Sequence, residues 1–408
     1  MTAERPVVCV LVDAFRHDYL TAEHAPFLAS LAGRSRTARM RPILGYSDAI
    51  RATIFTGAYP DEHGYWMEYC FHPASSPVSP LERLAPLDRL PSDLARRCLK
   101  FALSNTVVRA RARRLGYRQL SLRHLPFRSL GCFDWTLKTS MTAPGALGLP
   151  TLFDELDDAG IEWSYIDSSE SGRRGVLRAA QELPEQTRLA FVYLHPIDMA
   201  SHLVGLDSPL FWRVVRRTDA LLEQLVEAIE SRIGEHELVV FSDHGMSNVD
   251  RLVAYPELWV HPAFPKRFCF ALDATMVRLW YHDDDAALRG ELRERVASRA
   301  EGRFLSAEER SELHLDFRNR LYGDDIYLLE APAAIFPNFH SMLRPKAMHA
   351  YHPDDPDQHG IFVAPAGAGN GVGGNGTVEL VEVNAICKRL LGLTPQTHVE
   401  DRLVGANA

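Results

Sequence analysis

Ser47 carries a lone hydroxyl group just before a run of residues that predicts the first turn of a helix. The segment from Gly45 to Gly64 reads GYSDAIRATIFTGAYPDEHG. A serine hydroxyl is a weak nucleophile at neutral pH and needs a base or a metal ion to hold it as an alkoxide. A helix that begins just after Ser47 would direct free backbone N–H groups toward an anion at that hydroxyl. Ser47 is therefore our candidate nucleophile.

Six carboxylate and imidazole side chains follow apolar runs or sit in a late loop. They are Asp13, Asp198, His202, Asp243, His244 and His349. Open α/β sheets bind ligands at the carboxyl ends of their strands, so we expect these side chains at one rim. Such oxygen and nitrogen donors suit zinc or a similar divalent ion. Each alone could be structural, but together they predict two ions about 4 Å apart that hold the Ser47 alkoxide.

The elements that would position these residues come in two blocks of alternating strands and helices, residues 5–66 and 150–260. Apolar runs predict buried strands at VVCVLV, RLAFVYL and ELVVF, and IEWSYID predicts a further strand. A helix is predicted at 49–57, just after Ser47. A late strand, GIFVAPAG, precedes a glycine-rich turn at 369–377 and a closing helix.

The alternation is lost in two places, which predicts insertions at 66–150 and 262–345 within a single domain spanning 1–408. Between Asp93 and Asp134 the first insertion has no acidic residue. Its basic residues there are Arg96, Arg97, Lys100, Arg109, Arg111, Arg113, Arg114, Arg118, Arg123 and Arg128. This stretch predicts a basic helical cap that is either a solvated face paired with acids elsewhere or a surface for an anionic substrate or an anionic membrane.

Composition sets broad limits on the class of protein. A chain of 408 residues, 46% apolar and 24% charged, is typical of a soluble globular protein. The first residues contain neither a signal peptide nor a membrane span, so we expect a cytoplasmic location. Six scattered cysteines without a CxxC pair predict reduced thiols, with Cys9 and Cys387 in the core. A net charge of −8 argues against a protein that coats nucleic acid.

Five motifs in order resemble one known family. They are DAFRHDYL at 13–20, Ser47 with TGAYPDEHG up to 64, IDMASHLVG at 197–205, FSDHGMS at 241–247 and HAYHPDDPDQHGIFVA at 349–364. The chain resembles the alkaline phosphatase superfamily, in its type I phosphodiesterase/nucleotide pyrophosphatase branch. The resemblance implies an α/β, alkaline-phosphatase-like three-layer sandwich with a mostly parallel central sheet and two cap insertions.

The resemblance also implies a division of the ligands between two divalent ions, Zn²⁺ or alternatively Mn²⁺. One ion would be bound by Asp198, His202 and His349. The other would be bound by Asp13, Asp243, His244 and the nucleophile Ser47. In the last motif the family's first histidine falls on His349, which leaves His352 and His359 as rejected candidates.

Two departures from the family pattern affect the nucleophile. The branch usually has threonine there, followed by an asparagine that contacts a phosphate oxygen, and that asparagine is missing. Arg51 could replace it through a charge-assisted contact, or it could be paired with Asp48 or another acid. Ser47-Asp48-Ala49-Ile50-Arg51 also fits a relaxed sulfatase pattern, in which the first residue is converted to formylglycine.

The function implied is metal-dependent hydrolysis of a small-molecule or lipid-linked phosphate ester, as a phosphodiesterase or nucleotide pyrophosphatase with phosphorylated Ser47 as intermediate. Sulfatase or phosphate and phosphonate monoester hydrolase is the alternative. A non-catalytic descendant that binds an anion or a lipid through residues 96–128 is a third hypothesis, which the intact ligand set disfavours.

Overall fold

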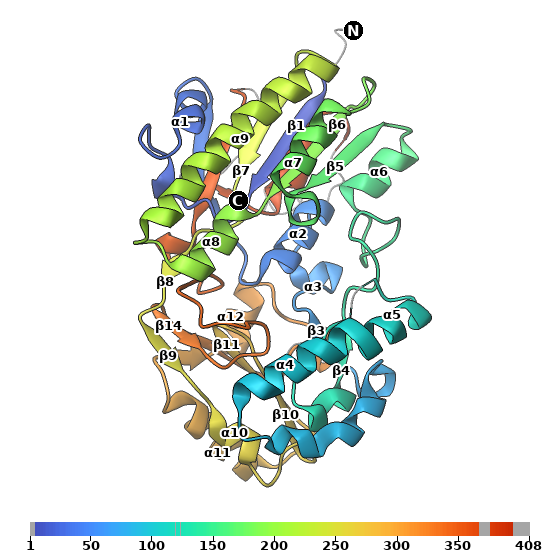
Figure 1. The fold of residues 1–408 in the computed structure, drawn as a ribbon, viewed down its shortest axis with the longest axis vertical. Helices are drawn as coiled ribbons and strands as arrows, with labels where there is room; N and C mark the ends of the chain where they lie inside the picture. Colours follow the sequence, from blue (N-terminus) through green and yellow to red (C-terminus); the bar gives the residue numbers. More distant parts are fainter. Residues whose placement is uncertain (1–4, 119, 123, 367–375, 395–408) are drawn as a thin grey trace.

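The computed structural model describes residues 5–118, 120–122, 124–366 and 376–394. Most of the predicted glycine-rich turn at 369–377 lies outside them, as does Arg123 of the basic stretch. Figure 1 shows a catalytic half built on a central sheet and a second half beneath it.

Seven strands form the central sheet. In spatial order they are β17 (Thr377–Glu379), β2 (Arg36–Arg41), β16 (Gly360–Ala364), β7 (Glu237–Phe241), β1 (Val7–Val12), β6 (Leu189–Leu194) and β5 (Trp163–Asp167). All run parallel except β16, which is antiparallel to both of its neighbours. β1 lies between β7 and β6, and all six of its residues are buried. The mostly parallel sheet predicted from the apolar runs is therefore confirmed.

Helices cover both faces of this sheet and make the three predicted layers. Val7, Cys9 and Leu11 of β1 point into one hydrophobic core, whereas Val8, Val10 and Val12 point into another, as the two-residue period of a strand requires. The first face is covered by α2 (Ser47–Thr56), α6 (Leu152–Asp158) and α13 (Glu382–Leu390). The second is covered by α1 (Pro26–Ala32), α7 (Ser168–Gln181), α8 (Pro196–Val204) and α9 (Pro209–Ile233).

The second half is built from both stretches that interrupt the alternation. Its main sheet has the order β10 (Phe268–Leu272), β11 (Met276–Tyr281), β13 (Asp325–Leu329), β12 (Gly302–Phe304), with antiparallel neighbours. Phe127 and Phe133 from the first stretch share one hydrophobic core with Phe270 and Leu279 from the second. Residues 66–150 and 262–345 thus pack on each other and are not two separate caps.

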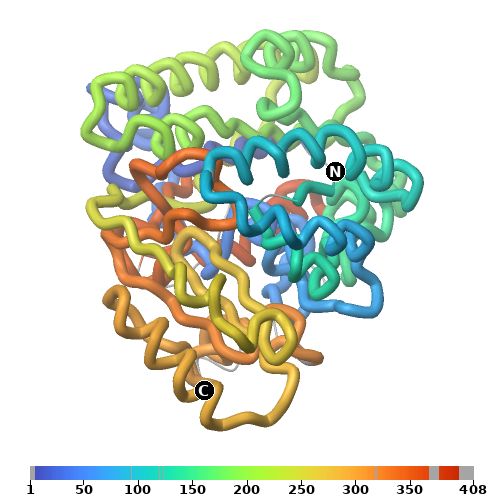
Figure 2. Tube along the Cα trace, turned by 60° about the horizontal axis from the view of Figure 1, so that its bottom comes forward, coloured from blue at the N-terminus to red at the C-terminus, as the bar shows by residue number. Residues whose placement is uncertain are grey.

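The basic stretch forms one long helical segment across this half. α4 (Asp93–Leu103) continues through a π-helical turn (Ser104–Val108) into α5 (Arg109–Leu115). Figure 2 shows this segment crossing the face of the molecule beside the C-terminal part of the chain drawn in orange.

The remaining elements are short. They are α3 (Pro60–His63), β3 (Tyr69–Phe71), β4 (Phe133–Trp135), β8 (Ser247–Asn248), β9 (Arg251–Val253), α10 (Pro256–Val260), α11 (Ala286–Ala297), α12 (Ala307–Glu312), β14 (Ala333–Ile335) and β15 (Ala347–Met348), with 3₁₀ turns at His17–Tyr19, Pro73–Ser75, Ser79–Arg89, Phe127–Cys132, Arg318–Arg320 and Pro356–Gln358. Among the described helices, none combines the length and the apolar character needed to cross a bilayer.

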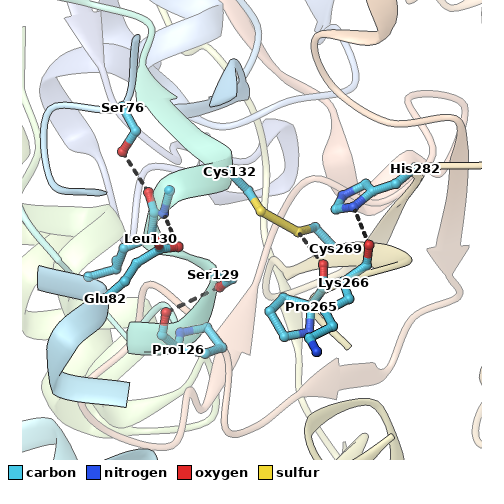
Figure 3. The surroundings of a disulfide bond; sticks show 11 residues. Ser76, Glu82, Pro126, Ser129, Leu130, Cys132, Pro265, Lys266, Cys269 and His282 are labelled. Carbon is cyan, nitrogen blue, oxygen red and sulfur yellow. Dashed lines mark hydrogen bonds between the residues drawn. A yellow bond between two sulfur atoms is a disulfide. The ribbon is translucent and has the colours of Figure 1, made fainter. Parts of the chain in front are cut away.

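The cysteines differ in part from the prediction of six reduced thiols. Cys9 and Cys387 are buried as expected, with their sulfur atoms 2.9 Å apart. Cys132 and Cys269, however, form a disulfide between the two interrupting stretches (Figure 3). The sequence could not predict this bond because 137 residues separate its partners. The cytoplasmic location expected from the sequence stays a prediction.

The second half contains a buried ion pair whose disruption we expect to be costly. Arg278 and Asp273 are fully buried, and the guanidinium donates to both carboxylate oxygens at 2.7 and 3.2 Å. Arg278→Met leaves a buried carboxylate without this partner and should lower the free energy of unfolding by about 3–5 kcal/mol. Arg178→Ala is the control, since Arg178 is 77% exposed and pairs with the exposed Glu182, and solvent-exposed pairs of this kind contribute little to stability. Urea denaturation of both variants measures the difference, and a loss in Arg278→Met no larger than in the control would contradict the prediction.

Candidate active site

A cavity of about 520 Å³ lies at the carboxyl ends of the parallel strands, where the sequence places the ligands. Ser47, Asp198, His202 and His349 all line it. Asp13 follows β1 directly, and Asp243 and His244 follow β7 within three residues. Residues far apart in the chain therefore meet at one rim because neighbouring parallel strands end there.

The first predicted ion site brings together Asp198, His202 and His349. Asp198 and His202 lie one turn apart on α8, with Nε2 of His202 3.1 Å from Oδ1 of Asp198. Nε2 of His349 lies 3.9 Å from the same oxygen. Nδ1 of His202 is 2.8 Å from the carbonyl of Ala347, which fixes the ring and leaves Nε2 for a metal ion. The three residues can supply one oxygen and two nitrogen donors to a single ion.

The second predicted ion site brings together Asp13, Asp243 and His244. Nε2 of His244 lies 3.2 Å from Oδ1 of Asp13 and 3.6 Å from Oδ2 of Asp243. Nδ1 of His244 is 2.7 Å from the carbonyl of Gly245, so again Nε2 is left for a ligand. Asp198 is close enough to Asp13 and His244 to lie between the two sites.

Each carboxylate of the second site has one oxygen held by the protein and one left over. Tyr193 donates its hydroxyl hydrogen bond to Oδ2 of Asp13, and the backbone N–H groups of Ala14 and His244 donate to Oδ1 of Asp243. The buried atoms without a hydrogen-bond partner include Oδ1 of Asp13, Oδ2 of Asp243, Oδ1 of Asp198 and Nε2 of His244. Since buried polar atoms are normally satisfied, this donor set fits bound divalent cations.

The electrostatics of the cluster lead to the same conclusion. Burial, together with the charge of Asp13, raises the pKa of Asp243 to about 7. Burial lowers the pKa of His244, but Asp243 and Asp13 outweigh it and raise this pKa to about 10. Burial and the neighbouring His244 hold the pKa of His349 well below its usual value. Three carboxylates packed this closely without solvent need a compensating positive charge, which metal ions would supply.

Ser47 is the first residue of α2, as its predicted place before a helix implies. Its hydroxyl has no hydrogen-bond partner among the described residues and faces the cavity lined by the ligands. The preceding residue, Tyr46, is fixed from the second half, because its hydroxyl lies 3.1 Å from both the hydroxyl and the backbone N–H of Thr275. Its ring also packs edge-on against His349, with ring centroids 5.4 Å apart.

Arg51 is paired with acidic residues, which is one of the two arrangements that the sequence left open. Its guanidinium bonds to Asp48, lies 3.7 Å from Asp167 and stands 4.9 Å from the ring of Tyr193. It is not among the residues that line the cavity. A contact between Arg51 and the transferring phosphoryl group thus has no support from its present position and stays a prediction.

His352 and His359 lie apart from the ligand clusters, in agreement with their rejection. Nδ1 of His352 is 3.7 Å from Asp354, and Nε2 of His359 is 2.9 Å from the carbonyl of Pro353. Neither joins the groups of residues close enough to share an ion in the described chain.

The structure adds two residues that the sequence analysis missed. Tyr193 orients Asp13, and it lies inside a uniformly apolar strand where nothing marks its hydroxyl. His340 lines the cavity from the 340–345 segment and lies 3.0 Å from Asp273 and 3.6 Å from Glu68. Burial lowers the pKa of His340, but these carboxylates outweigh it and raise the pKa above its usual value. The sequence predicted only a loop there.

Three comparisons with known proteins agree with this geometry. The family model for type I phosphodiesterase / nucleotide pyrophosphatase matches residues 7–320. An uncharacterized pyrophosphatase/phosphodiesterase of Schizosaccharomyces pombe is 26% identical over 252 residues, which cover 59% of this chain and 44% of that protein. The chain thus spans less than half the length of this curated relative.

Solved structures of ectonucleotide pyrophosphatase / phosphodiesterase 5 have the same fold. The human protein matches with a TM-score of 0.67 at 16% identity, covering 97% of this chain and 96% of that one. An inactive variant of the murine protein, in complex with AMP, matches with a TM-score of 0.66 at 16% identity, covering 96% of each chain. The alkaline-phosphatase-like architecture expected from the motifs is therefore confirmed.

The hydrogen bond from Tyr193 to Asp13 yields a prediction for metal binding. Tyr193→Phe removes the group that orients this carboxylate and should weaken the binding of Zn²⁺ by about 10–100-fold while the fold persists. Competition with a chelating dye measures the affinity, and circular dichroism checks the fold. Tyr19→Phe is the matched control, because Tyr19 is also buried and its hydroxyl has no partner among the described residues. Equal affinities in the two variants would contradict the prediction.

Proposed function

The chain belongs to the type I phosphodiesterase/nucleotide pyrophosphatase family, and we propose that it hydrolyses phosphate esters, in particular phosphodiesters or nucleotide pyrophosphates, with two bound divalent ions. The observation that carries the proposal is the convergence of six ligand-type side chains, with five buried polar atoms among them that have no hydrogen-bond partner, beside a serine hydroxyl without a partner among the described residues.

Ser47 has the central role in this mechanism. The hydroxyl of Ser47 loses its proton to solvent, its oxygen attacks phosphorus and the bond to the departing alcohol or phosphate breaks, so that Ser47 carries the phosphoryl group with its remaining ester substituent. Water then attacks this phosphorus from the side opposite Ser47, the bond to the serine oxygen breaks, the serine oxygen takes up a proton, and the phosphate monoester leaves. Bound divalent ions would lower the pKa of the serine hydroxyl and neutralise the phosphoryl oxygens. The N-terminus of α2 directs its first backbone N–H groups at the same anion.

The donor set also bears on the identity of the ions. Three imidazoles and three carboxylates favour Zn²⁺, because imidazole is a preferred zinc ligand. Mn²⁺ is the second candidate, since carboxylates suit it. Asp198, His202 and His349 would hold one ion, and Asp13, Asp243, His244 and Ser47 the other.

Sulfatase or phosphate monoester hydrolase activity is the second candidate function, because Ser47, Ala49 and Arg51 retain the relaxed sulfatase spacing. That chemistry uses formylglycine at the first position. Intact-protein mass spectrometry separates the two, because conversion of Ser47 to formylglycine removes two hydrogen atoms. An unmodified mass favours the phosphoserine mechanism.

Replacing the nucleophile tests the mechanism directly. Ser47→Ala should lower kcat by about 10³-fold or more, because no other hydroxyl can form the intermediate. The fold and the bound metal should persist, since Ser47 supplies only one of the ligands. Metal content by atomic emission is the internal control. A variant with wild-type turnover would show that Ser47 is not the nucleophile.

A panel of three chromogenic esters tests the substrate class. We expect bis-p-nitrophenyl phosphate to be hydrolysed faster than p-nitrophenyl phosphate and p-nitrophenyl sulfate. The activity should disappear after chelation and return with Zn²⁺ or Mn²⁺, because the cation site fixes and activates the nucleophile. A preference for the sulfate or the monoester would support the second candidate, and activity that survives chelation would contradict metal dependence.

A further inference from the structure

A second cavity adjoins the catalytic one. It has a volume of about 630 Å³, and His340 and Met342 line both cavities. Its other walls come from the basic helical segment α4–α5 and from Arg118, Leu120, Ser121 and His124. We call it the basic cavity. The two spaces share these wall residues, so a molecule that reached from Ser47 into the basic cavity would pass His340.

Arg109 and Arg113 give the basic cavity its charge. Both are exposed on α5, one helical turn apart, and both line the cavity. Within the described chain neither has an ion pair or a hydrogen bond. Like charges four residues apart on a helix repel each other by a few tenths of a kcal/mol. The repulsion between these two guanidinium groups therefore slightly destabilises the helix. No acidic residue is among the described residues that line the cavity.

Other basic residues of the segment have structural partners, which distinguishes them from this pair. Arg97 donates to the carbonyl of Ser341, Lys100 to that of Leu125 and Arg111 to that of Pro77. Arg118 lines the cavity but is paired with Glu170. The pairing of Arg118 with Glu170 is the arrangement expected of a solvated face, whereas Arg97, Lys100 and Arg111 bond to backbone carbonyls. Arg109 and Arg113 are left available for a ligand.

Apolar side chains complete the wall. Phe101, Leu120 and Met342 line the basic cavity, and Phe101 is 61% exposed. A ligand that fits must therefore be an anion attached to a short apolar linker. Arginine pairs bind phosphate well, because the planar guanidinium matches two phosphate oxygens at once.

We propose that the basic cavity binds a second phosphate of the substrate, so that the substrate is a phosphodiester in which one ester group carries a further phosphate on a short carbon linker. This inference rests on the proposed function, since the first phosphate must lie at Ser47. Arg109 and Arg113 bind the second phosphate, and Phe101 and Met342 contact the linker.

The experiment compares two matched probes, p-nitrophenyl 3-phosphopropyl phosphate and p-nitrophenyl 3-hydroxypropyl phosphate. They release the same p-nitrophenol and differ only in the distal phosphate. We expect the wild-type kcat/KM to be about tenfold or more higher for the phosphate-bearing probe. This preference should decline as salt is added, because the contact is between exposed charges.

The double variant Arg109→Gln/Arg113→Gln should bring the two kcat/KM values together and leave that of the hydroxypropyl probe unchanged. Arg114→Gln is the matched control: Arg114 is exposed on the same helix but does not line the cavity, so it should keep the preference. Equal rates for the two probes in the wild type, or a preference that survives in the double variant, would overturn the inference.

Two further outcomes have distinct meanings. If neither probe is hydrolysed, the proposed function fails. Calorimetric titration with glycerol 3-phosphate then tests phosphate binding in the basic cavity by itself. Equal affinity in the wild type and the double variant overturns phosphate binding by Arg109 and Arg113, whereas loss of affinity in the double variant supports it. If the double variant loses only binding to phosphatidylglycerol vesicles, with substrate preference unchanged, the arginines serve a membrane surface and the substrate assignment is wrong.

Discussion

The burial of several carboxylates at one edge of the sheet is the constraint on which the rest of the structure depends. Asp13 and Asp243 are almost fully buried and both contact the ring of His244. Burial, together with the like charge of Asp13, raises the pKa of Asp243 to about 7. The protein holds one oxygen of each carboxylate with Tyr193 or a backbone N–H and leaves the other without a hydrogen-bond partner in the described chain. The strands, their register and the helix after each strand all serve to keep these groups together.

The second half completes the catalytic cavity. Thr275, beside β11, holds Tyr46 and thereby the start of the helix that carries Ser47. The segment 340–345 forms a wall of the cavity, and His340 stands where it meets the basic cavity. The two interrupting stretches share one core and a disulfide, so they form a single support for this wall. The walls of this cavity therefore come from both halves of the molecule.

Local patterns were enough to predict the catalytic half. Buried parallel strands are continuous apolar runs in the sequence. A polar residue just past such a run lies at the carboxyl edge of the sheet, and this rule predicted the positions of Asp13 and Asp243. Motif order then separated His349 from the two histidines next to it. The missed features all depend on contacts between distant residues. Nothing near Tyr193 or His340 in sequence indicates their partners, and the pairing of Cys132 with Cys269 follows only from the joint core of the second half.

Arg51 shows how a residue can fit a catalytic pattern and still be held by structural contacts. Its guanidinium is bound to Asp48, next to the nucleophile, and stands over the ring of Tyr193, whose hydroxyl bonds to Asp13. A buried guanidinium needs carboxylate partners, and Asp48 and Asp167 supply them from α2 and the end of β5. These contacts tie the helix that presents Ser47 to the strand that presents the tyrosine. Arg51 thus links the helix that begins at Ser47 to β5 and β6, and its positive charge is balanced by Asp48 and Asp167.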